Sequence, residues 1–546
     1  MANGWMVLAG VWVGLGGLGS LTAQAQGSPA AAAPGKKVCT VNRSAPGPAE
    51  TALDKGDFAP AENQFRGLLA KDPADETAQE GLVRALIAQD KVDAAAKQAE
   101  AWVAASPSSS MAMVAQAEVL LRQGDPRAAL LEFQKASQTD LCNARAYYGI
   151  SMVYGLAGYH ATQKRIIEQA YALHPTDDQI NSAWINTRPR AERLEKLADY
   201  AEHSDQISEE SRAKMKTSLA KASLYHPSDC RATPTSLETA TVPMWEINAG
   251  PFSFEGWGLE VKFNGKSRRL EIDTGASGIT ISRSAALFLG IKREDETKIY
   301  GIGDEGPVNA SIAHVASVKI GGMEFTNCAV SILEKSRALH DSDGLIGGDV
   351  FAGSQVTLDF PRRELRIAPL PPRPNEAKPQ TTLDAGVNDD AEEWQDPYVA
   401  PEMAKWERVY RNGHELLMPT GIVDAKHFKD DSAFKDKLFL LDTGAESNLI
   451  SPAAAREVTK VSGSDWGGVQ GISGEVDKVY EAGRFTLAFA GLHMDSPAMT
   501  AVDTTTLSHD AGVEISGLIG APTLFQLVMH VDYRDNLVWC EHKPRK

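Results

Sequence analysis

Two short segments of the sequence place an aspartate at the end of an apolar run. Residues 270–277 read Leu-Glu-Ile-Asp-Thr-Gly-Ala-Ser, and residues 438–446 read Leu-Phe-Leu-Leu-Asp-Thr-Gly-Ala-Glu. In each segment we expect a strand that ends at the aspartate, Asp273 in the first and Asp442 in the second. Two facing carboxylates cannot both ionise easily, so they share one proton and can act together as general base and general acid. The repeated motif therefore predicts acid-base hydrolysis.

Two further landmarks recur after each motif in the same order. A glycine-rich turn at 301–306 matches one at 471–474, and Gly-Leu-Ile-Gly occurs at 344–347 and again at 517–520. A single Asp-Thr-Gly is usually only a turn. Three landmarks repeated in order indicate that the two halves are an internal repeat.

On these residues the two halves, about 250–368 and 412–540, resemble the lobes of aspartic proteases of the pepsin and retroviral protease kind. The segment 343–351 is similar to bacterial retropepsin-like proteins. The resemblance implies an all-β, two-lobed acid-protease fold with a catalytic dyad of Asp273 and Asp442 that needs neither metal nor cofactor. It also implies supporting residues in the two loops, which are Thr274, Gly275, Thr443 and Gly444. Flaps that close over an extended peptide substrate would contain Tyr300, Gly301, Gly303, Gly471 and Gly474.

The two halves also differ from each other near the motifs. Ser277 stands where the second half has Glu446, and Gly348-Asp349-Val350 stands where it has Ala521-Pro522-Thr523. We therefore expect an asymmetric site, whose substrate preference cannot be copied from either group of proteases.

Residues 48–225 are predicted to be helical with a period of 34 residues. This period, and the residue types that share a register, resemble tetratricopeptide repeats. We therefore expect an all-α solenoid, which would be either a structural spacer or a concave surface for a protein partner or substrate. Since such repeats contact mainly their neighbours, we expect the β-lobes to fold without them. The residues in register are Pro73, Pro107 and Pro175; Ala61, Ala95 and Ala129; Phe65, Phe133 and Ile167; and Gly56, Gly124 and Gly158.

The N-terminal 25 residues are predicted to be a signal peptide, because residues 5–21 are apolar and Ala-Gln-Ala at 23–25 fits a cleavage site. This predicts export to the periplasm or the medium. An uncleaved anchor is the alternative, but five glycines make residues 5–21 a poor helix. No other segment has the ~20 apolar residues that span a bilayer, so we expect no stable span after cleavage.

The predicted segments of the whole chain are 1–25 signal, 26–47 linker, 48–225 repeats, 226–245 connector, 246–368 lobe 1, 369–405 linker and 406–546 lobe 2.

Charge and cysteine usage exclude other classes of function. The formal net charge of −17 argues against a nucleic-acid partner. The five cysteines lack metal-site spacing, and their odd number leaves at least one thiol unpaired in a monomer, with the pairing left open. His414-Glu415 has Met418 where a zinc-protease helix needs its second histidine.

The sequence thus predicts an exported aspartic endopeptidase that follows a helical-repeat solenoid. One alternative is a catalytically inactive scaffold, in which the repeats bind a partner on a retropepsin-like fold. Another is a dimer whose lobes pair between chains, because the linker at 369–405 is long enough for either arrangement.

Overall fold

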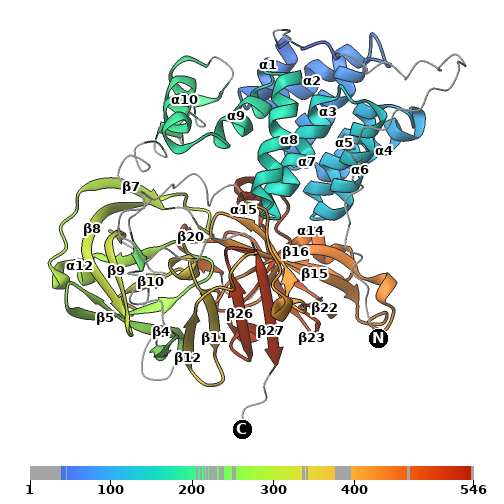
Figure 1. Ribbon diagram of the computed structural model, residues 1–546. Coiled ribbons are helices and arrows are strands. Elements are labelled where there is room, and N and C mark those ends of the chain that lie inside the picture. Colours follow the sequence, from blue (N-terminus) through green and yellow to red (C-terminus); the bar gives the residue numbers. More distant parts are fainter. Residues whose placement is uncertain are drawn as a thin grey trace, which may run out of the picture. The chain divides into compact units, whose positions relative to one another are not determined.

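The computed structural model describes residues 39–542 except for 43, 45, 205–206, 210–211, 214, 217–218, 220–229, 233–238, 249–253, 300, 335–338, 340–341, 375–394 and 464–467. The predicted signal peptide and Tyr300 lie outside the described residues, as do parts of the predicted linkers and connector. Figure 1 shows a run of helices followed by strands, the predicted change from an all-α to an all-β region.

The helices pair into antiparallel hairpins because capping residues and turns recur with the 34-residue period. Asp75, Ser109, Asn143 and Asp177 each cap a helix, with the side-chain oxygen accepting the N–H three residues later. The helices are α1 (Pro48–Asp54), α2 (Phe58–Leu69), α3 (Glu76–Ala88), α4 (Val92–Ala105), α5 (Ser110–Arg122), α6 (Pro126–Thr139), α7 (Ala144–Leu156), α8 (His160–Leu173), α9 (Asp178–Asn186) and α10 (Arg190–His203).

Glycines let neighbouring helices approach closely at two equivalent places. A Cβ on Gly81 of α3 would lie 2.2 Å from the ring of Phe65 in α2, and a Cβ on Gly149 of α7 would lie 2.2 Å from the ring of Phe133 in α6. Both rings are buried. The large residue of one helix therefore fills the space that the glycine of the next helix leaves open.

This close packing makes Gly149→Ala a destabilising change. We expect it to lower the free energy of unfolding by about 1–3 kcal/mol, since the added methyl group must displace the Phe133 ring from a packed core. Gly67→Ala is the matched control, because Gly67 is exposed in α2 with no atom within 4 Å of an added Cβ. It should raise stability by up to about 1 kcal/mol through helix propensity. Denaturant unfolding of both variants checks this, and equal effects would contradict the packing account.

A buried ion cluster joins the first helices of four successive hairpins. Arg145 of α7 bonds Glu80 of α3 at 2.7 Å, Glu118 of α5 at 2.6 Å and Asp177, the cap of α9, at 3.0 Å. Burial raises the pKa of Glu80 to about 7 although Arg145 opposes the shift. Burial also raises the pKa of Asp54 to about 6 and, together with the charge of Asp54, that of Asp178 to about 7. Burial therefore favours the protonated form of Glu80, Asp54 and Asp178, whereas the charges of Arg145 and Arg84 outweigh burial at Asp177 and lower its pKa.

Because these carboxyl pKa values are raised in the folded protein, we expect the helices to be more stable at mildly acidic pH. A carboxyl with a raised folded-state pKa stabilises the fold fully below its unfolded value near 4, and this contribution is lost as pH rises through 6 to 7. We expect the helical region to lose about 1–3 kcal/mol of stability between pH 5 and pH 8. Glu80→Gln should flatten this dependence, and Glu62→Gln should not, because the pKa of Glu62 is lowered by its bond with Lys91. Unfolding of the three proteins across this pH range is the measurement; a slope that Glu80→Gln leaves unchanged would contradict it.

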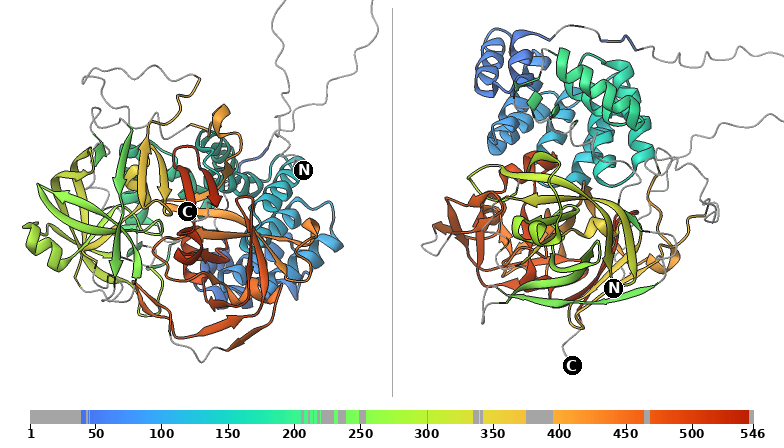
Figure 2. Two further views of the ribbon diagram at one scale, coloured as in Figure 1. Left: turned by 90° about the horizontal axis from the view of Figure 1, so that it is seen from below. Right: turned by 90° about the vertical axis from the view of Figure 1, so that its left-hand side faces the viewer.

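Each β half contains a short central strand that pairs with two neighbouring strands in the same directions. In the first half, the short strand β10 runs parallel to β5 and antiparallel to β6. In the second half, β25 runs parallel to β16 and antiparallel to β17. Figure 2 shows the first half in green to yellow and the second half in orange to red. The predicted internal repeat is thus visible in the strand order of the two sheets.

The strands and short helices of the first half are β1 (Arg231–Ala232), β2 (Ala240–Pro243), β3 (Trp245–Asn248), β4 (Phe254–Phe263), β5 (Lys266–Ile272), β6 (Ile279–Ser282), α12 (Arg283–Leu289), β7 (Asp295–Ile299), β8 (Val308–Ile320), β9 (Met323–Leu333), β10 (Gly344–Ile346), η2 (Gly348–Phe351), β11 (Gln355–Asp359) and β12 (Glu364–Ala368). Those that follow are η3 (Pro401–Met403), β13 (Glu407–Arg408), β14 (Tyr410–Asn412), β15 (Glu415–Asp424), η4 (Asp431–Ala433), β16 (Lys435–Leu441), β17 (Leu449–Ile450), α14 (Pro452–Arg456), β18 (Val461–Gly463), β19 (Gln470–Gly471), β20 (Gly474–Glu475), β21 (Val479–Ala482), β22 (Phe485–Phe489), β23 (Leu492–Ser496), β24 (Met499–Val502), α15 (Thr505–Ala511), β25 (Gly517–Ile519), α16 (Ala521–Leu524), β26 (Leu527–Asp532) and β27 (Leu537–His542).

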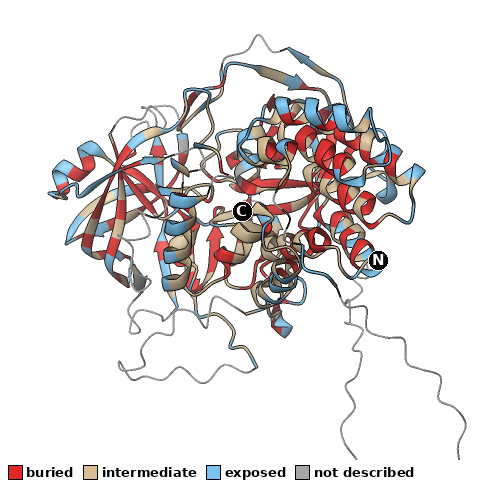
Figure 3. Ribbon diagram, turned by 90° about the horizontal axis from the view of Figure 1, so that it is seen from above, coloured by how far each residue is buried: buried red, intermediate tan, exposed pale blue. Residues whose placement is uncertain are grey.

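A third sheet joins the two halves within the chain. Its order is β13-β27-β26-β11-β12-β2, and β11 of the first half pairs with β26 of the second half along its whole length. Buried apolar residues of both halves form one hydrophobic cluster that includes Val356 on β11 and Val531 on β26. Figure 3 shows many strand residues of both halves in the buried class. In this structure the two lobes therefore pair within one chain.

The helices share a second hydrophobic cluster with the second half. It contains Leu121 of α5 and Phe133 of α6 together with Leu438 on β16 and Leu518 on β25. Polar contacts accompany it: Lys437 donates to the carbonyl of Gln123 at 3.0 Å, and Arg122 donates to that of Ser508 at 3.2 Å. The expectation that the repeats contact mainly their neighbours is wrong for α5 and α6, because apolar residues of the second β half pack with them.

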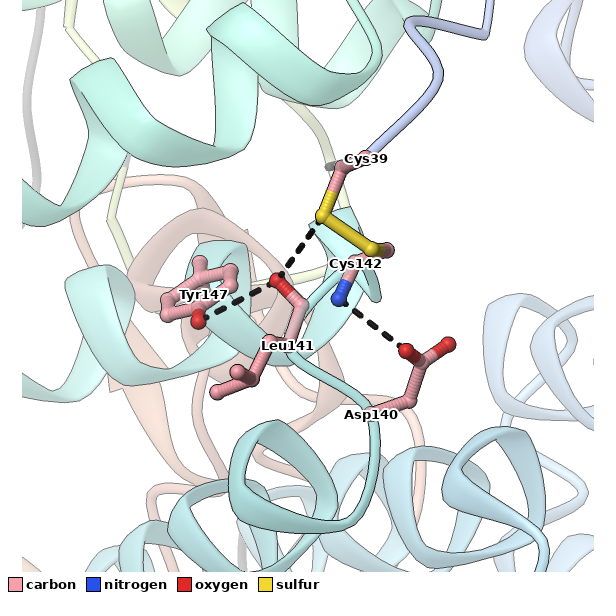
Figure 4. Close-up of a disulfide and its surroundings, with 5 residues drawn as sticks. All are labelled: Cys39, Asp140, Leu141, Cys142 and Tyr147. Carbon is pink, nitrogen blue, oxygen red and sulfur yellow. Dashed lines mark hydrogen bonds between the residues drawn. A yellow bond between two sulfur atoms is a disulfide. The ribbon is translucent and has the colours of Figure 1, made fainter. Parts of the chain in front are cut away.

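Two disulfides tie distant segments together. Cys39 is bonded to Cys142, and Cys230 to Cys328, whereas Cys540 is a buried free thiol. Figure 4 shows the first bond beside Leu141, whose carbonyl accepts a hydrogen bond from the Tyr147 hydroxyl at 3.3 Å. A search of the described residues for a helix long and apolar enough to span a membrane finds none.

Candidate active site

Each Asp-Thr-Gly motif begins at the end of a strand, where an equivalent backbone hydrogen bond holds its aspartate. The amide of Asp273 donates to the carbonyl of Ile346 at 3.0 Å, and the amide of Asp442 donates to that of Ile519 at 3.0 Å. Both acceptors lie in the Gly-Leu-Ile-Gly segments, so these segments fix where each aspartate leaves its sheet.

The two loops hold each other through a reciprocal set of threonine hydrogen bonds. The amide of Thr274 donates to Oγ1 of Thr443, and the amide of Thr443 donates to Oγ1 of Thr274, both at 3.0 Å. Each hydroxyl in turn donates at 2.7 Å to the last strand residue of the opposite half, Thr274 to Leu441 and Thr443 to Ile272. Both side chains are buried, and every polar group in this exchange has a partner. The exchange fixes the register of the two carboxylates.

The motif glycines bring the carboxylates close to the opposite loop. A Cβ on Gly275 would lie 2.8 Å from the carboxyl of Asp442, and one on Gly444 would lie 2.6 Å from that of Asp273. The amide of Gly275 donates to Oδ1 of Asp273 at 2.8 Å, and that of Gly444 to Oδ1 of Asp442 at 3.0 Å. Only glycine fits here, since any side chain would push the carboxylates apart.

The aspartate pair favours a bound proton. Burial raises the pKa of Asp273 well above its ordinary range, and the charges of Asp442 and Glu271 raise it further. Burial also raises the pKa of Asp442, while its bond with Asp273, the amides of Gly444 and Ala445 and the charge of His414 oppose this shift. The two carboxyls therefore titrate as a coupled pair, as facing carboxylates must.

The predicted flap glycines meet in one place. The amide of Ser473 donates to the carbonyl of Ile302 at 3.0 Å, and the amide of Glu305 donates to that of Ser473 at 2.8 Å. A Cβ on Gly303 would lie 2.3 Å from the Ser473 backbone, and one on Gly471 would lie 2.2 Å from the Ile302 carbonyl. Gly301 donates its amide to Oγ of Ser473 at 3.1 Å, and Gly474 has φ +97°. The turns of the two halves are thus hydrogen-bonded to each other.

Each flap packs towards the motif of the other half. Ile302 of the first half belongs to the cluster that contains Ala445, the residue after the second Asp-Thr-Gly. Ile472 of the second half belongs to the cluster that contains Ala276 and Leu345 of the first half. The two glycine-rich turns therefore reach the neighbourhood of both Asp-Thr-Gly loops.

Two residues close to the pair were not predicted from the sequence. His414, in the turn between β14 and β15, lies with Nε2 at 2.9 Å from the carbonyl oxygen of Gly275. Glu271 lies two residues before Asp273 on β5. In the sequence, His414 stands out only as a possible zinc ligand, but the Asn412-Gly413 turn signal also predicts that it lies at the tip of a hairpin. Among the described residues, no group of three or more His, Cys, Asp or Glu side chains is arranged to hold a metal.

A family model described as aspartyl protease matches residues 259–350, the segment that contains the first motif. An aspartic proteinase from Irpex lacteus shares 9% identity at a TM-score of 0.33, over 56% of this chain and 97% of that one. A thermophilic TPR protein of Thermus thermophilus shares 21% identity at a TM-score of 0.26, over 31% of this chain and 92% of that one. No curated protein sequence matches the chain. The family match thus agrees with the resemblance to aspartic proteases that the sequence predicts for the first half, and the helices precede the β halves as expected.

Proposed function

We propose that the protein is an aspartic endopeptidase whose dyad is Asp273 and Asp442. The observation that carries this proposal is the close approach of the two carboxyls on loops held by the reciprocal bonds of Thr274 and Thr443. A Cβ on Gly275 would lie 2.8 Å from the carboxyl of Asp442, and one on Gly444 would lie 2.6 Å from that of Asp273. A catalytically inactive scaffold has no need to keep two half-buried carboxyls together, since desolvation and mutual repulsion both cost stability.

The arrangement suits hydrolysis of a peptide bond. One ionised carboxylate takes a proton from water as the water oxygen bonds to the carbonyl carbon, and the protonated carboxyl donates to the carbonyl oxygen. When the C–N bond breaks, the first carboxyl gives its proton to the nitrogen and the gem-diol returns a proton to the second. Water and peptide become an acid and an amine, and the pair is restored. The meeting turns at 301–305 and 471–475 would close over the peptide and exclude water.

We further propose that the protein is exported to the periplasm or the medium. The two disulfides support this, because such bonds persist mainly in oxidising compartments. We also propose that helix surfaces outside the cluster with the second half bind a protein partner or substrate. The exposed Leu68 of α2 and Leu131 of α6 are apolar groups on such surfaces.

The test is cleavage of a peptide library by the purified protein across acid and neutral pH. We expect endoproteolytic products that a statine-type transition-state mimic suppresses, because such a mimic carries a hydroxyl where the attacking water sits. A protein that cleaves no peptide at any pH, while binding partners through its helices, would support the inactive scaffold.

A further inference from the structure

The Asp-Thr-Gly loop of the first half is anchored on both sides of Gly275. Before it, the amide and the hydroxyl of Thr274 are both bonded to the second half. After it, the amide of Gly278 donates to Oδ1 of Asp349 at 2.9 Å. The amide of Gly275 itself donates to Oδ1 of Asp273 at 2.8 Å. The placement of Gly275 therefore decides where this bond holds the Asp273 carboxyl.

The carbonyl group of Gly275 is bonded to a side chain of the other half. Nε2 of His414 lies 2.9 Å from this oxygen, although the two residues are 139 positions apart in the sequence. Because a carbonyl oxygen only accepts, Nε2 is the donor, and it carries a proton in the neutral ring as well as in the charged one. Gly275 is thus held through both of its backbone polar groups, the amide by Asp273 and the carbonyl by His414.

The hairpin that carries this histidine is built firmly into the second half. Gly413 makes its tip with φ +58°, and the side chain of Asn412 donates across the turn to Oε2 of Glu415 at 3.0 Å. The next two residues, Leu416 and Leu417, are both buried, and they belong to two different hydrophobic clusters. Since β15 is packed on both faces, the hairpin gives the histidine ring a fixed origin.

The second half supports its own Asp-Thr-Gly loop in another way. The carbonyl of Ala445 accepts from the amide of Ala521 at 2.8 Å, and the amide of Gly520 donates to Oδ1 of Asn448 at 2.8 Å. These bonds join residues of the same half, whereas the bond to the Gly275 carbonyl comes from the opposite half. The two loops are therefore held by different groups, in line with the asymmetric site that the sequence predicts.

We propose that His414 is a positioning residue for catalysis: its Nε2–H holds the carbonyl of Gly275, so that the Gly275 amide keeps the Asp273 carboxyl in the orientation that proton transfer requires. His414 acts through Gly275 and exchanges no proton with the attacking water. The role matters because a misplacement of about 1 Å can cost on the order of 10²-fold in rate. This inference rests on the proposed protease function.

The donor can be removed and then restored at the same position. His414→Ala removes the N–H group and should lower kcat about tenfold or more with KM changed by less than about twofold, because the lost bond acts on the reacting carboxyl rather than on the bound peptide. His414→Gln places an amide N–H at a similar reach and should keep kcat within about threefold of the wild type. A wild-type kcat in His414→Ala, or equal losses in both variants, would overturn the proposal.

A histidine elsewhere in the same half serves as the matched control. His427→Ala removes an exposed ring that lies 3.8 Å from Asp424, at the end of β15 opposite to His414. We expect kcat and KM to stay at their wild-type values. A tenfold loss of kcat in this variant as well would show that the effect is not specific to His414, and would overturn the proposal.

A second readout does not depend on cleavage. At a pH where the ring of His414 is neutral, ring ¹⁵N NMR should find the proton on Nε2, because the other tautomer would turn a lone pair towards the Gly275 oxygen. The signals are assigned by their loss in His414→Gln. Exchange of the Gly275 amide should be faster in His414→Ala than in the wild type and in His414→Gln.

These measurements separate the two claims. A neutral ring with its proton on Nδ1, or equal exchange of the Gly275 amide in all three proteins, would overturn the role of His414. Absence of peptide cleavage by a wild type that shows the Nε2 proton and the protected amide would instead contradict the proposed function.

Discussion

Asp273→Asn and Asp442→Asn each lower kcat/KM for peptide cleavage by about 10²-fold or more, because an amide can neither donate nor accept the proton that the pair exchanges with water. Both aspartates are half-buried, and the hydrogen bonds of Thr274 and Thr443 to the backbone are unaffected by the change. Each variant should therefore fold. Steady-state kinetics with one fluorogenic peptide measures the loss.

The stability of these variants gives an independent check with a definite sign. Burial raises the pKa of both carboxyls, so their ionisation opposes folding as pH rises above the folded values. Asn removes this cost, and both variants should melt at or above the wild-type temperature at pH 8. Asp295→Asn, at an exposed position of β7, should change neither activity nor melting. Near-full activity in either folded Asp→Asn variant would remove that residue from the dyad.

A chain that lacks residues 39–204 should lose the stability of its second half. The buried residues Leu438, Leu440 and Leu518 then lose the apolar neighbours that α5 and α6 supply. Each exposed leucine costs about 1.5–3 kcal/mol, so a few of them approach the whole stability of a typical domain. Hydrogen exchange should rise in β16 and β25. It should rise less in β4 and β8 of the first half, whose hydrophobic cluster contains no described residue of helices α1–α10.

A pair of single substitutions in the full chain serves as control. Leu121→Ala removes a buried side chain of the shared cluster and should cost about 2–5 kcal/mol, with faster exchange at 503–519. Leu131→Ala, at an exposed position of α6, should cost less than about 0.5 kcal/mol. A shortened chain with wild-type exchange in β16 and β25 would show that the helices are an independent module after all.

The features that can be predicted from the sequence are those that depend on residues close together along the chain. The repeated Asp-Thr-Gly, the glycine turns and the 34-residue period each lie within short segments, so the two lobes, the meeting loops and the helix pairs follow from them. Gly275 and Gly444 illustrate this, because the absence of a side chain predicts a close approach before any partner is known. The structure adds that the approach is to the opposite carboxylate.

The features that the sequence does not predict depend on contacts between distant segments. Gly275 and His414 are 139 positions apart, and Gln123 and Lys437 are 314 apart. No local pattern links such pairs, because they meet only after both halves and the helices have packed. Glu271 is different, since alternation along its strand places it on the Asp273 face from the sequence alone.

One chain is expected to form one complete two-aspartate site, and mixing the two inactive variants tests this expectation. Equal amounts of Asp273→Asn and Asp442→Asn protein are combined, and cleavage of a peptide that the wild type hydrolyses is measured. If the lobes pair within the chain through β11 and β26, every site keeps one Asn and the mixture stays inactive. Recovery of roughly a quarter to a half of wild-type activity, by the statistics of chain exchange, would show that the lobes pair between chains and would contradict the account.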